Sequence, residues 1–162
     1  MSDVDKAQLV SILRARLTSE VANMTRLAVE QAEAASHEEN KPENDKDMRS
    51  TEASYLAKGQ ADRVQSLEHA LALLTSMPIR HFGSSESIQA SALIDVRGPQ
   101  GARTYFLLPA LGGERLGHDG KEIHTLATTS PLGRALLGLI AGEEAEVATP
   151  QGTQTYEVAS VR

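Results

Sequence analysis

The sequence predicts an α+β fold: an N-terminal antiparallel two-helix coiled coil, followed by a small antiparallel β domain with one short helix. Two periodicities support this prediction. Apolar residues recur at steps of three and four in the first half of the chain, as in helices, and at period two from Ile88 onward, as in strands. The segment TSMPIRHFGSSES, with its proline and glycine, separates the two patterns. We therefore predict a coiled-coil hairpin over residues 1–78 and a β domain over residues 79–162.

The first predicted helix has an apolar stripe along one face and no residue that would interrupt it. Glycine and proline are both absent before Pro42, so nothing in this stretch removes a backbone hydrogen bond or kinks the helix. Residues three and four positions apart share a helix face. The stripe consists of Val10, Leu13, Leu17, Val21, Met24, Ala28 and Ala35.

The second predicted helix follows the heptad rule, because the steps along its stripe alternate between four and three. Two helices that a short segment joins are expected to pair antiparallel, with their stripes facing. We place Pro42 in the turn and the N-cap of the second helix at Asn44 or Asp45. The helix should end at Met77, since a residue before proline disfavours the helical conformation. Its stripe consists of Ala53, Ala57, Gln60, Val64, Leu67, Leu71 and Leu74.

An acidic run, SHEENKPENDKDMR, lies where the hairpin turns, near residues 37–49. Like charges repel one another, so such a cluster costs stability unless a cation comes to meet it. Two interpretations stay open: a solvated loop, or a site presented to a metal ion or a basic partner. His37 could ligate a metal there, although an exposed loop histidine is the more common case. The carboxylates belong to Glu38, Glu39, Glu43, Asp45 and Asp47.

The first part of the β domain reads as a hairpin and a further strand. Residues 88–96 and 103–110 have strand periodicity and flank the turn RGPQGA, which predicts a hairpin. The glycine-rich residues 111–122 predict a loop, and residues 123–128 predict a strand.

The last part of the domain reads as a short helix and two strands. Ser130 as N-cap and Pro131 at the first helical position predict a helix that reaches about Leu137. Residues 145–149 and 154–161 predict two strands that the turn PQG joins.

Charge and composition exclude several classes of protein. The net charge of −6 argues against a protein that holds DNA through its own phosphate contacts, and 3% aromatic residues argue against a stacking platform for single strands. The absence of cysteine excludes disulfides, a thiolate nucleophile and Cys-ligated zinc. No apolar run approaches membrane-spanning length, and the start MSDVDKAQ is unlike a signal peptide. We expect a cytoplasmic protein with no membrane partner and no strong direct DNA binding.

The segment SPLGRALLGLIAGEEAEVATPQGTQTYEV, residues 130–158, resembles the end of bacterial transcript cleavage factors of the GreA/GreB type. The shared features are a Ser-Pro before a short helix, a Leu-Gly after it, and the string Pro-x-Gly-x-x-x-Tyr-Glu-Val. A two-helix coiled coil with an acidic turn is also the architecture of that family. The resemblance implies an FK506-binding-protein-like (FKBP-like) C-terminal domain.

The resemblance further implies a transcription elongation factor that binds bacterial RNA polymerase at the mouth of its secondary channel. The coiled coil would reach toward the active centre, where tip carboxylates help to hold magnesium, and would modulate cleavage of backtracked RNA. Such a factor is an accessory and not an enzyme itself. It holds no cofactor stably, shares the magnesium with the polymerase, and meets nascent RNA only indirectly. We expect a monomer, because a short turn favours pairing of the helices within one chain.

The tip departs from the family pattern, which resembles Asp-Leu-x-Glu-Asn-Ala-Glu-Tyr with two acids three positions apart. The comparable stretch here is DMRSTEASY. If Asp47 takes the first acidic place, Ser50 occupies the second. If Tyr55 anchors the match, the two places fall on Met48 and Thr51. Neither register keeps both acids, so binding to polymerase is better supported than stimulation of cleavage.

The acids before this stretch could substitute for the missing pair. We take Glu43, Asp45 and Asp47 as the candidate tip residues, with Asp45 and Asp47 as magnesium ligands within the polymerase complex only. Ser130 and Pro131 are the candidate polymerase contacts that the resemblance implies.

Three alternatives stay open. The first is a channel-binding regulator that inhibits cleavage, and the second is a coiled-coil, FKBP-like adaptor without polymerase activity. The third is an FKBP-type peptidyl-prolyl isomerase or peptide binder, which needs an aromatic-lined pocket, and two phenylalanines with no tryptophan make such a pocket a poor prospect.

Overall fold

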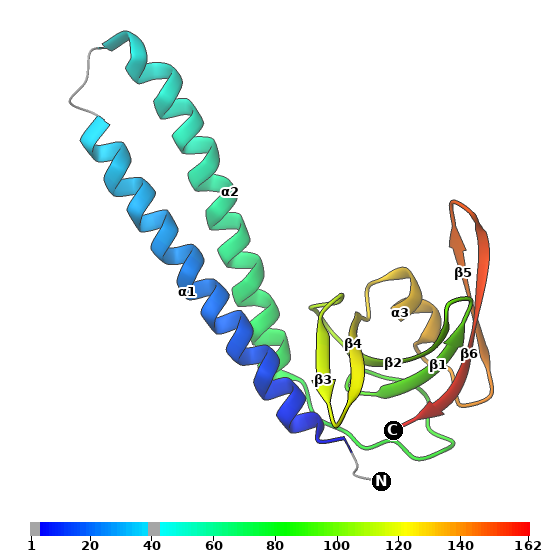
Figure 1. Ribbon diagram of the computed structural model, residues 1–162. Coiled ribbons are helices and arrows are strands. Elements are labelled where there is room, and N and C mark those ends of the chain that lie inside the picture. Colours follow the sequence, from blue (N-terminus) through cyan, green and yellow to red (C-terminus); the bar gives the residue numbers. More distant parts are fainter. Residues whose placement is uncertain (1–3, 39–42) are drawn as a thin grey trace. The chain divides into compact units, whose positions relative to one another are not determined.

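Two long helices, a six-stranded sheet and a short third helix make up the described part of the computed structural model (Figure 1). The described backbone comprises residues 4–38 and 43–162, and the described side chains comprise residues 4–34 and 57–162. None of the helices in these ranges has a stretch that is long and apolar enough to cross a membrane.

The chain divides into two compact units. One consists of residues Ile12–Ala72, and the other combines Met1–Ser11 with Leu73–Arg162. The sheet unit thus includes the first residues of the first helix and the last residues of the second, whereas the predicted boundary lies at residue 78.

The two long helices are α1 (Lys6–Glu38) and α2 (Glu43–Ser76). α2 ends directly before Met77, as predicted from the following proline. The predicted N-cap is wrong, because the helix already includes Asn44 and Asp45. Acidic residues are as favourable in the first helical turn as at the cap, since both lie at the positive end of the helix dipole. Pro42, predicted in the turn, lies outside the described residues.

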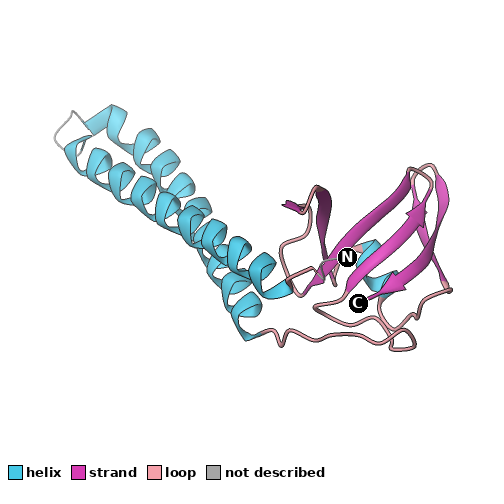
Figure 2. Cartoon of the chain, turned by 60° about the horizontal axis from the view of Figure 1, so that its bottom comes forward, coloured by secondary structure: helices cyan, strands magenta, loops and turns pink. Residues whose placement is uncertain are grey.

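α1 and α2 lie side by side over most of their length (Figures 1 and 2). Within the helical unit, Leu13, Leu17 and Leu67 are buried, as their stripe positions predict. An ion pair also joins the helices, with 3.1 Å between Arg63 Nη2 and Glu20 Oε1. Both partners of this pair are exposed, so the apolar seam contributes more to pairing than the charge does.

The sheet has the strand order β3-β4-β2-β1-β6-β5. Both predicted hairpins are confirmed: β1 pairs antiparallel with β2, and β5 with β6. The strands are β1 (Leu93–Gly98), β2 (Gly101–Leu108), β3 (Arg115–His118), β4 (Lys121–Ala127), β5 (Glu144–Thr149) and β6 (Gly152–Val161).

Two predictions about the sheet are wrong. Residues 111–122 are not all loop, because β3 lies among them and pairs antiparallel with β4. The sheet is also not purely antiparallel, because β2 and β4 run parallel, from the pair Thr104 and Ile123 to the pair Leu108 and Ala127. β3 lies in the connection between β2 and β4. Because β2 and β4 run parallel while the other neighbouring strands run antiparallel, the sheet is mixed.

The short helix α3 (Pro131–Leu136) covers one face of the sheet (Figure 2). Its Leu136 is fully buried in the same apolar cluster as Ile94 and Val96 of β1 and Val158 of β6. Alternate residues of each strand point to this face, which gives the core its period of two.

A buried lysine connects the start of α1 to the sheet unit. Lys6 is 3% exposed, and its Nζ donates hydrogen bonds to the backbone carbonyls of Arg80, at 2.5 Å, and Arg162, at 2.8 Å. The ammonium also lies 5.0 Å from the centre of the Phe82 ring. Two carbonyls and an aromatic face together replace the water that the buried charge loses.

Candidate functional site

The acidic residues predicted at the tip lie at the start of α2. Glu43, Asp45 and Asp47 all fall within its first turns and not in a loop. An α-helix has about 3.6 residues per turn, so positions 43 and 47 are one turn apart, while position 45 lies on another side. Their side chains lie outside the described ones. The helix therefore brings at most two of the three positions onto one face.

Carboxylates suit magnesium, which prefers oxygen ligands and commonly takes one or two carboxylates from a protein. The pair at positions 43 and 47 fits that requirement by donor type and number. Among the side chains that the structure describes, no group of three or more His, Cys, Asp or Glu could hold a metal ion. His37 and the tip acids are outside that set.

Ser130 and Pro131, the other predicted site residues, form the start of α3. Ser130 is the N-cap: its Oγ accepts a hydrogen bond from the backbone N–H of Gly133 at 3.0 Å and donates one to the carbonyl of Ala127 at 2.7 Å. Pro131 occupies the first turn, as predicted, and is exposed. The hydroxyl proton of Ser130 is thus already used within the loop.

The loop before α3 is tightly closed. A Cβ added at Gly133 would lie 2.0 Å from the carbonyl oxygen of Ala127, a separation that no real Cβ shows. Arg134 also holds the loop, because its Nε donates a hydrogen bond to the carbonyl of Thr129 at 2.7 Å. The Ser-Pro-x-Gly string of residues 130–133 therefore has a local structural role, whatever it contacts.

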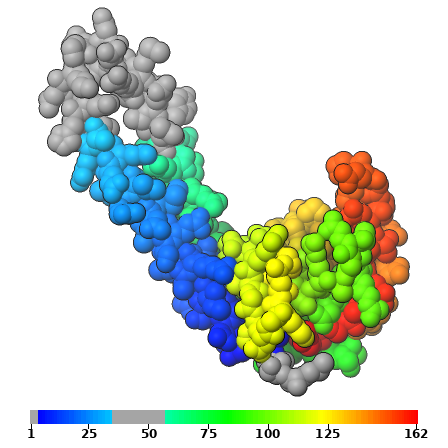
Figure 3. All heavy atoms as spheres, in the orientation of Figure 1, coloured from blue at the N-terminus to red at the C-terminus, as the bar shows by residue number. Residues whose placement is uncertain are grey.

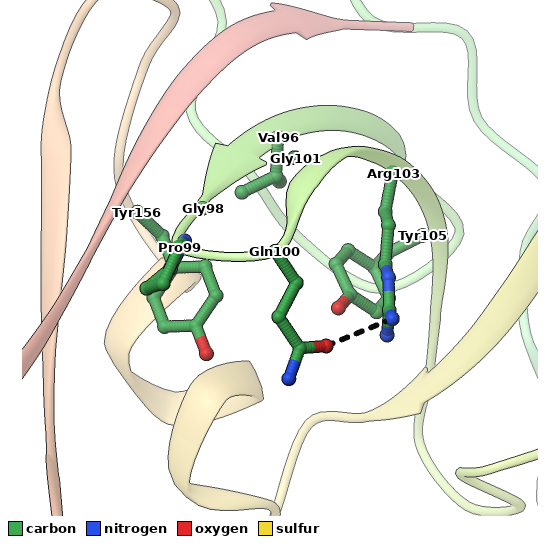
Figure 4. A pocket seen from close by; sticks show the side chains of 8 residues that line it. All are labelled: Val96, Gly98, Pro99, Gln100, Gly101, Arg103, Tyr105 and Tyr156. Carbon is green, nitrogen blue, oxygen red and sulfur yellow. Dashed lines mark hydrogen bonds between the residues drawn. The ribbon is translucent and has the colours of Figure 1, made fainter.

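A small hollow of about 70 Å³ opens beside the β1–β2 turn, on the α3 side of the sheet (Figure 4). Figure 4 shows Tyr105 and Tyr156 on either side of Gln100. Gly98 permits this arrangement, because a Cβ there would lie 2.6 Å from the Tyr156 ring. The hollow is lined by Val96, Gly98, Pro99, Gln100, Gly101, Arg103, Tyr105 and Tyr156.

The sequence did not point to this hollow, although a Pro-x-Gly turn between strands was visible. Two tyrosines at distant positions form it, and only the pairing of β1 with β6 brings Tyr156 next to Gly98. At about 70 Å³ it is too small for a drug-sized ligand, which needs about 300 Å³ or more. It gives no support to a prolyl isomerase.

Comparison with known proteins places residues 120–162 in the family described as "Transcription elongation factor, GreA/GreB, C-term". The matched segment contains the whole of β4, α3, β5 and β6. It therefore covers the Ser130 loop and three of the six strands, with β1, β2 and β3 outside the match.

Two transcription elongation factors GreA are also similar in sequence. That of Halorhodospira halophila is 43% identical over 49 residues, which is 29% of this chain and 31% of the relative. That of Hyphomonas neptunium is 30% identical over 102 residues, which is 61% of this chain and 60% of the relative. The matched part thus spans less than two thirds of either relative.

Solved structures of the GreA factor homolog Gfh1 are similar over nearly the whole chain. The protein of Thermus thermophilus matches with a TM-score of 0.37 and 18% identity, over 92% of this chain and 94% of that one. The protein of Thermus aquaticus matches with a TM-score of 0.39 and 19% identity, over 91% and 92%. Scores this low carry no argument about function.

Proposed function

Because the chain belongs to the GreA/GreB-type family of transcription elongation factors, we propose that it binds bacterial RNA polymerase at the secondary channel and modulates cleavage of backtracked transcripts. The observation that carries this proposal is the family match over residues 120–162, which contains the closed loop at Ser130. The family match supports RNA polymerase as the partner, and binding at its secondary channel is the further step that we propose.

The helical hairpin supplies the reach that such a role requires. α1 has 33 residues, and at about 1.5 Å per residue a helix of this size is about 50 Å long. The acids Glu43, Asp45 and Asp47 lie at the end of α2 next to the turn, far along the hairpin from Ser76. We propose that this end is the one delivered to the polymerase active centre.

Asp47 and Glu43, one turn apart on α2, would hold a magnesium ion that the polymerase shares, whereas Asp45, the other predicted ligand, lies on another side of the helix. When bound, magnesium polarises a phosphoryl oxygen and activates water for attack. The carboxylates of this chain would orient and retain the ion and neutralise part of its charge. The bond-breaking chemistry belongs to the polymerase, so the chain acts as an accessory and not as an enzyme.

On the sheet domain, the exposed Pro131 is the proposed contact with the polymerase rim. The two hydrogen bonds of Ser130 hold the backbone of this loop in one conformation. A preformed loop loses little conformational entropy when it binds.

A second candidate function is occupation of the channel with inhibition of cleavage. The spacing of the tip acids favours it. The family pattern has two acids three positions apart, and in this chain those two positions hold either Asp47 and Ser50 or Met48 and Thr51, so at least one acid is missing. A single face of α2 carries at most positions 43 and 47. The tip could therefore enter the channel without holding the ion in a productive place.

A transcript-cleavage assay on stalled, backtracked bacterial RNA polymerase tests the proposal. The double variant Glu43→Ala/Asp47→Ala is compared with wild type, and with Asp62→Ala/Glu68→Ala as a control that removes two acids elsewhere on α2. Faster cleavage that only the tip variant loses, with binding retained, indicates a magnesium-delivering tip. Binding of the wild type with slower or unchanged cleavage indicates a factor that occupies the channel without stimulating cleavage. If the wild type does not bind polymerase, both candidate functions are contradicted.

A further inference from the structure

A groove of about 810 Å³ lies between the β1–β2 and β3–β4 hairpins and shares only Val96 and Arg103 with the hollow beside Tyr156. Figure 3 shows a furrow between the yellow atoms of the β3–β4 hairpin and the green atoms of the β1–β2 hairpin. All residues that line it belong to the sheet unit. They are Asp95, Val96, Arg97, Ala102, Arg103, Thr104, Arg115, Lys121, Glu122, His124, Ala159 and Ser160.

The groove exists because β2 and β4 diverge at their starts. They pair from Thr104 and Ile123 onward, and the preceding residues of the two strands have no partner across this gap. Ala102 and Arg103 of β2 are paired with β1 on the other side only. A short stretch of strand edge therefore faces the groove, and such an edge is where an extended chain can add main-chain hydrogen bonds.

Cations outnumber carboxylates along the groove. Arg97, Arg103, Arg115 and Lys121 reach it from four different strands and are all exposed. The Arg97 side chain has neither a hydrogen bond nor an ion pair with any residue that the structure describes, although Glu157 lies opposite it on β6. This local excess of positive charge contrasts with the net charge of −6 of the whole chain.

The two carboxylates of the groove already have partners. Asp95 accepts hydrogen bonds from Thr104 Oγ1 and Ser160 Oγ, both at 2.6 Å, and from Arg162 Nη2 at 3.1 Å. Burial alone would raise the pKa of Asp95, but these hydrogen bonds and the charges of Arg162 and Lys121 hold it below the ordinary value. Glu122 Oε1 lies 2.8 Å from His124 Nε2. Neither acid is left to neutralise Arg97.

We propose that this groove binds an acidic, extended peptide segment of a partner protein. Its carboxylates would pair with Arg97, Arg103 and Lys121, and its backbone would meet the open edge of β2. Arginine suits such pairing, because its planar guanidinium matches a carboxylate with two parallel hydrogen bonds.

A protein segment fits this groove better than a nucleic acid does. Single strands are usually held by exposed aromatic rings on which bases stack, and the only ring in the lining is that of His124, which is largely buried against Tyr105. Glu122 at the rim would repel a continuous row of phosphates, but it could pair with a lysine or arginine of a peptide. The inference concerns a second surface and does not rest on the proposed polymerase function.

Fluorescence anisotropy with three labelled probes tests the proposal on the full chain. The probes are a decapeptide of alternating Glu and Thr, the corresponding Lys and Thr decapeptide, and a ten-nucleotide oligouridine RNA. We expect the acidic peptide to bind with a Kd on the order of 100 μM at low salt. The Kd should rise several-fold at about 0.5 M salt, where exposed charges are screened.

Two matched variants locate the site. Arg97→Gln/Lys121→Gln should weaken binding of the acidic peptide by about tenfold or more. Arg26→Gln/Lys58→Gln removes the same charge from the exposed surface of the helices and should leave the Kd within about twofold. Equal losses in both variants, tighter binding of the RNA, or no binding of the acidic peptide up to about 1 mM would each overturn the proposal. Circular dichroism of each variant verifies that it is folded.

Discussion

The Ser130 hydroxyl accepts a hydrogen bond of 3.0 Å from the backbone N–H of Gly133, in a loop that has no space for a side chain at position 133. This relationship explains in local terms why a Ser-Pro-x-Gly string starts the short helix. It also separates two roles: the cap and the glycine shape the loop, and Pro131 is what the loop exposes.

Replacement of Gly133 by alanine should destabilise the sheet domain by at least about 2 kcal/mol, because the new methyl group would overlap the carbonyl of Ala127. Gly117→Ala is the matched control, since a Cβ at Gly117 has no neighbour within 4 Å. Urea denaturation followed by circular dichroism measures both. Equal, small effects of the two substitutions would show that the loop is not closed as described.

Replacement of Lys6 by methionine should lower the free energy of unfolding by about 2–4 kcal/mol. Methionine keeps most of the aliphatic volume but removes the donor to both carbonyls; the Arg80 carbonyl loses this hydrogen bond, whereas that of Arg162 keeps one from the backbone N–H of Leu93. Lys58→Met, on the exposed surface of α2, is the control and should change stability little. A Lys6→Met protein as stable as this control would mean that water replaces the lost donor.

Asp95 should make stability depend on pH in the acid range. Its pKa in the folded protein lies below the ordinary value of 3.8, so the ionised form stabilises the fold. That stability is fully present above the ordinary value and is lost as the pH falls through the folded-state pKa. Asp95→Asn should therefore be less stable than wild type at pH 7, and the difference should shrink between about pH 5 and pH 2.

Thermal unfolding of both proteins across this pH range measures the difference. Asp62→Asn, on the exposed surface of α2, is the matched control. A difference between Asp95→Asn and wild type that stays constant with pH would show that lost packing, and not lost charge, causes the effect.

Local sequence chemistry predicted the elements whose geometry is local. Ser130 and Pro131 gave the start of α3, the proline after Met77 gave the end of α2, and the turn RGPQGA gave the β1–β2 hairpin. In each case the relevant contacts lie within a few residues of one another.

The features that the sequence did not predict depend on distant partners. β3 is short and flanked by glycines, which indicate a loop. Its pairing with β4, which local sequence does not reveal, makes it a strand. The parallel pairing of β2 with β4 begins only at Thr104 and Ile123, so the groove opens before it, between residues such as Ala102 and Lys121. Lys6 is buried against the usual preference of lysine for solvent, because two distant carbonyls meet it.

The seam of the helical hairpin also combines a feature that the sequence predicts with one that it does not. Leu17 and Leu67 are buried, as the heptad pattern predicts, but Gln60 interrupts the stripe with an amide. Its Oε1 is buried and has no hydrogen-bond partner among the described residues. A polar residue at a seam position costs stability and can fix the register of the helices.

Site-specific crosslinking tests the central claim most directly. The chain has no cysteine, so Ser50→Cys gives a unique thiol near the turn, and Ser85→Cys gives one in the sheet unit as a control. Each carries a short photocrosslinker and is irradiated with bacterial RNA polymerase. The account predicts that position 50, and not position 85, crosslinks to polymerase segments around the active centre. Crosslinks from position 50 only to the outer surface of polymerase, or none from either position, would contradict it.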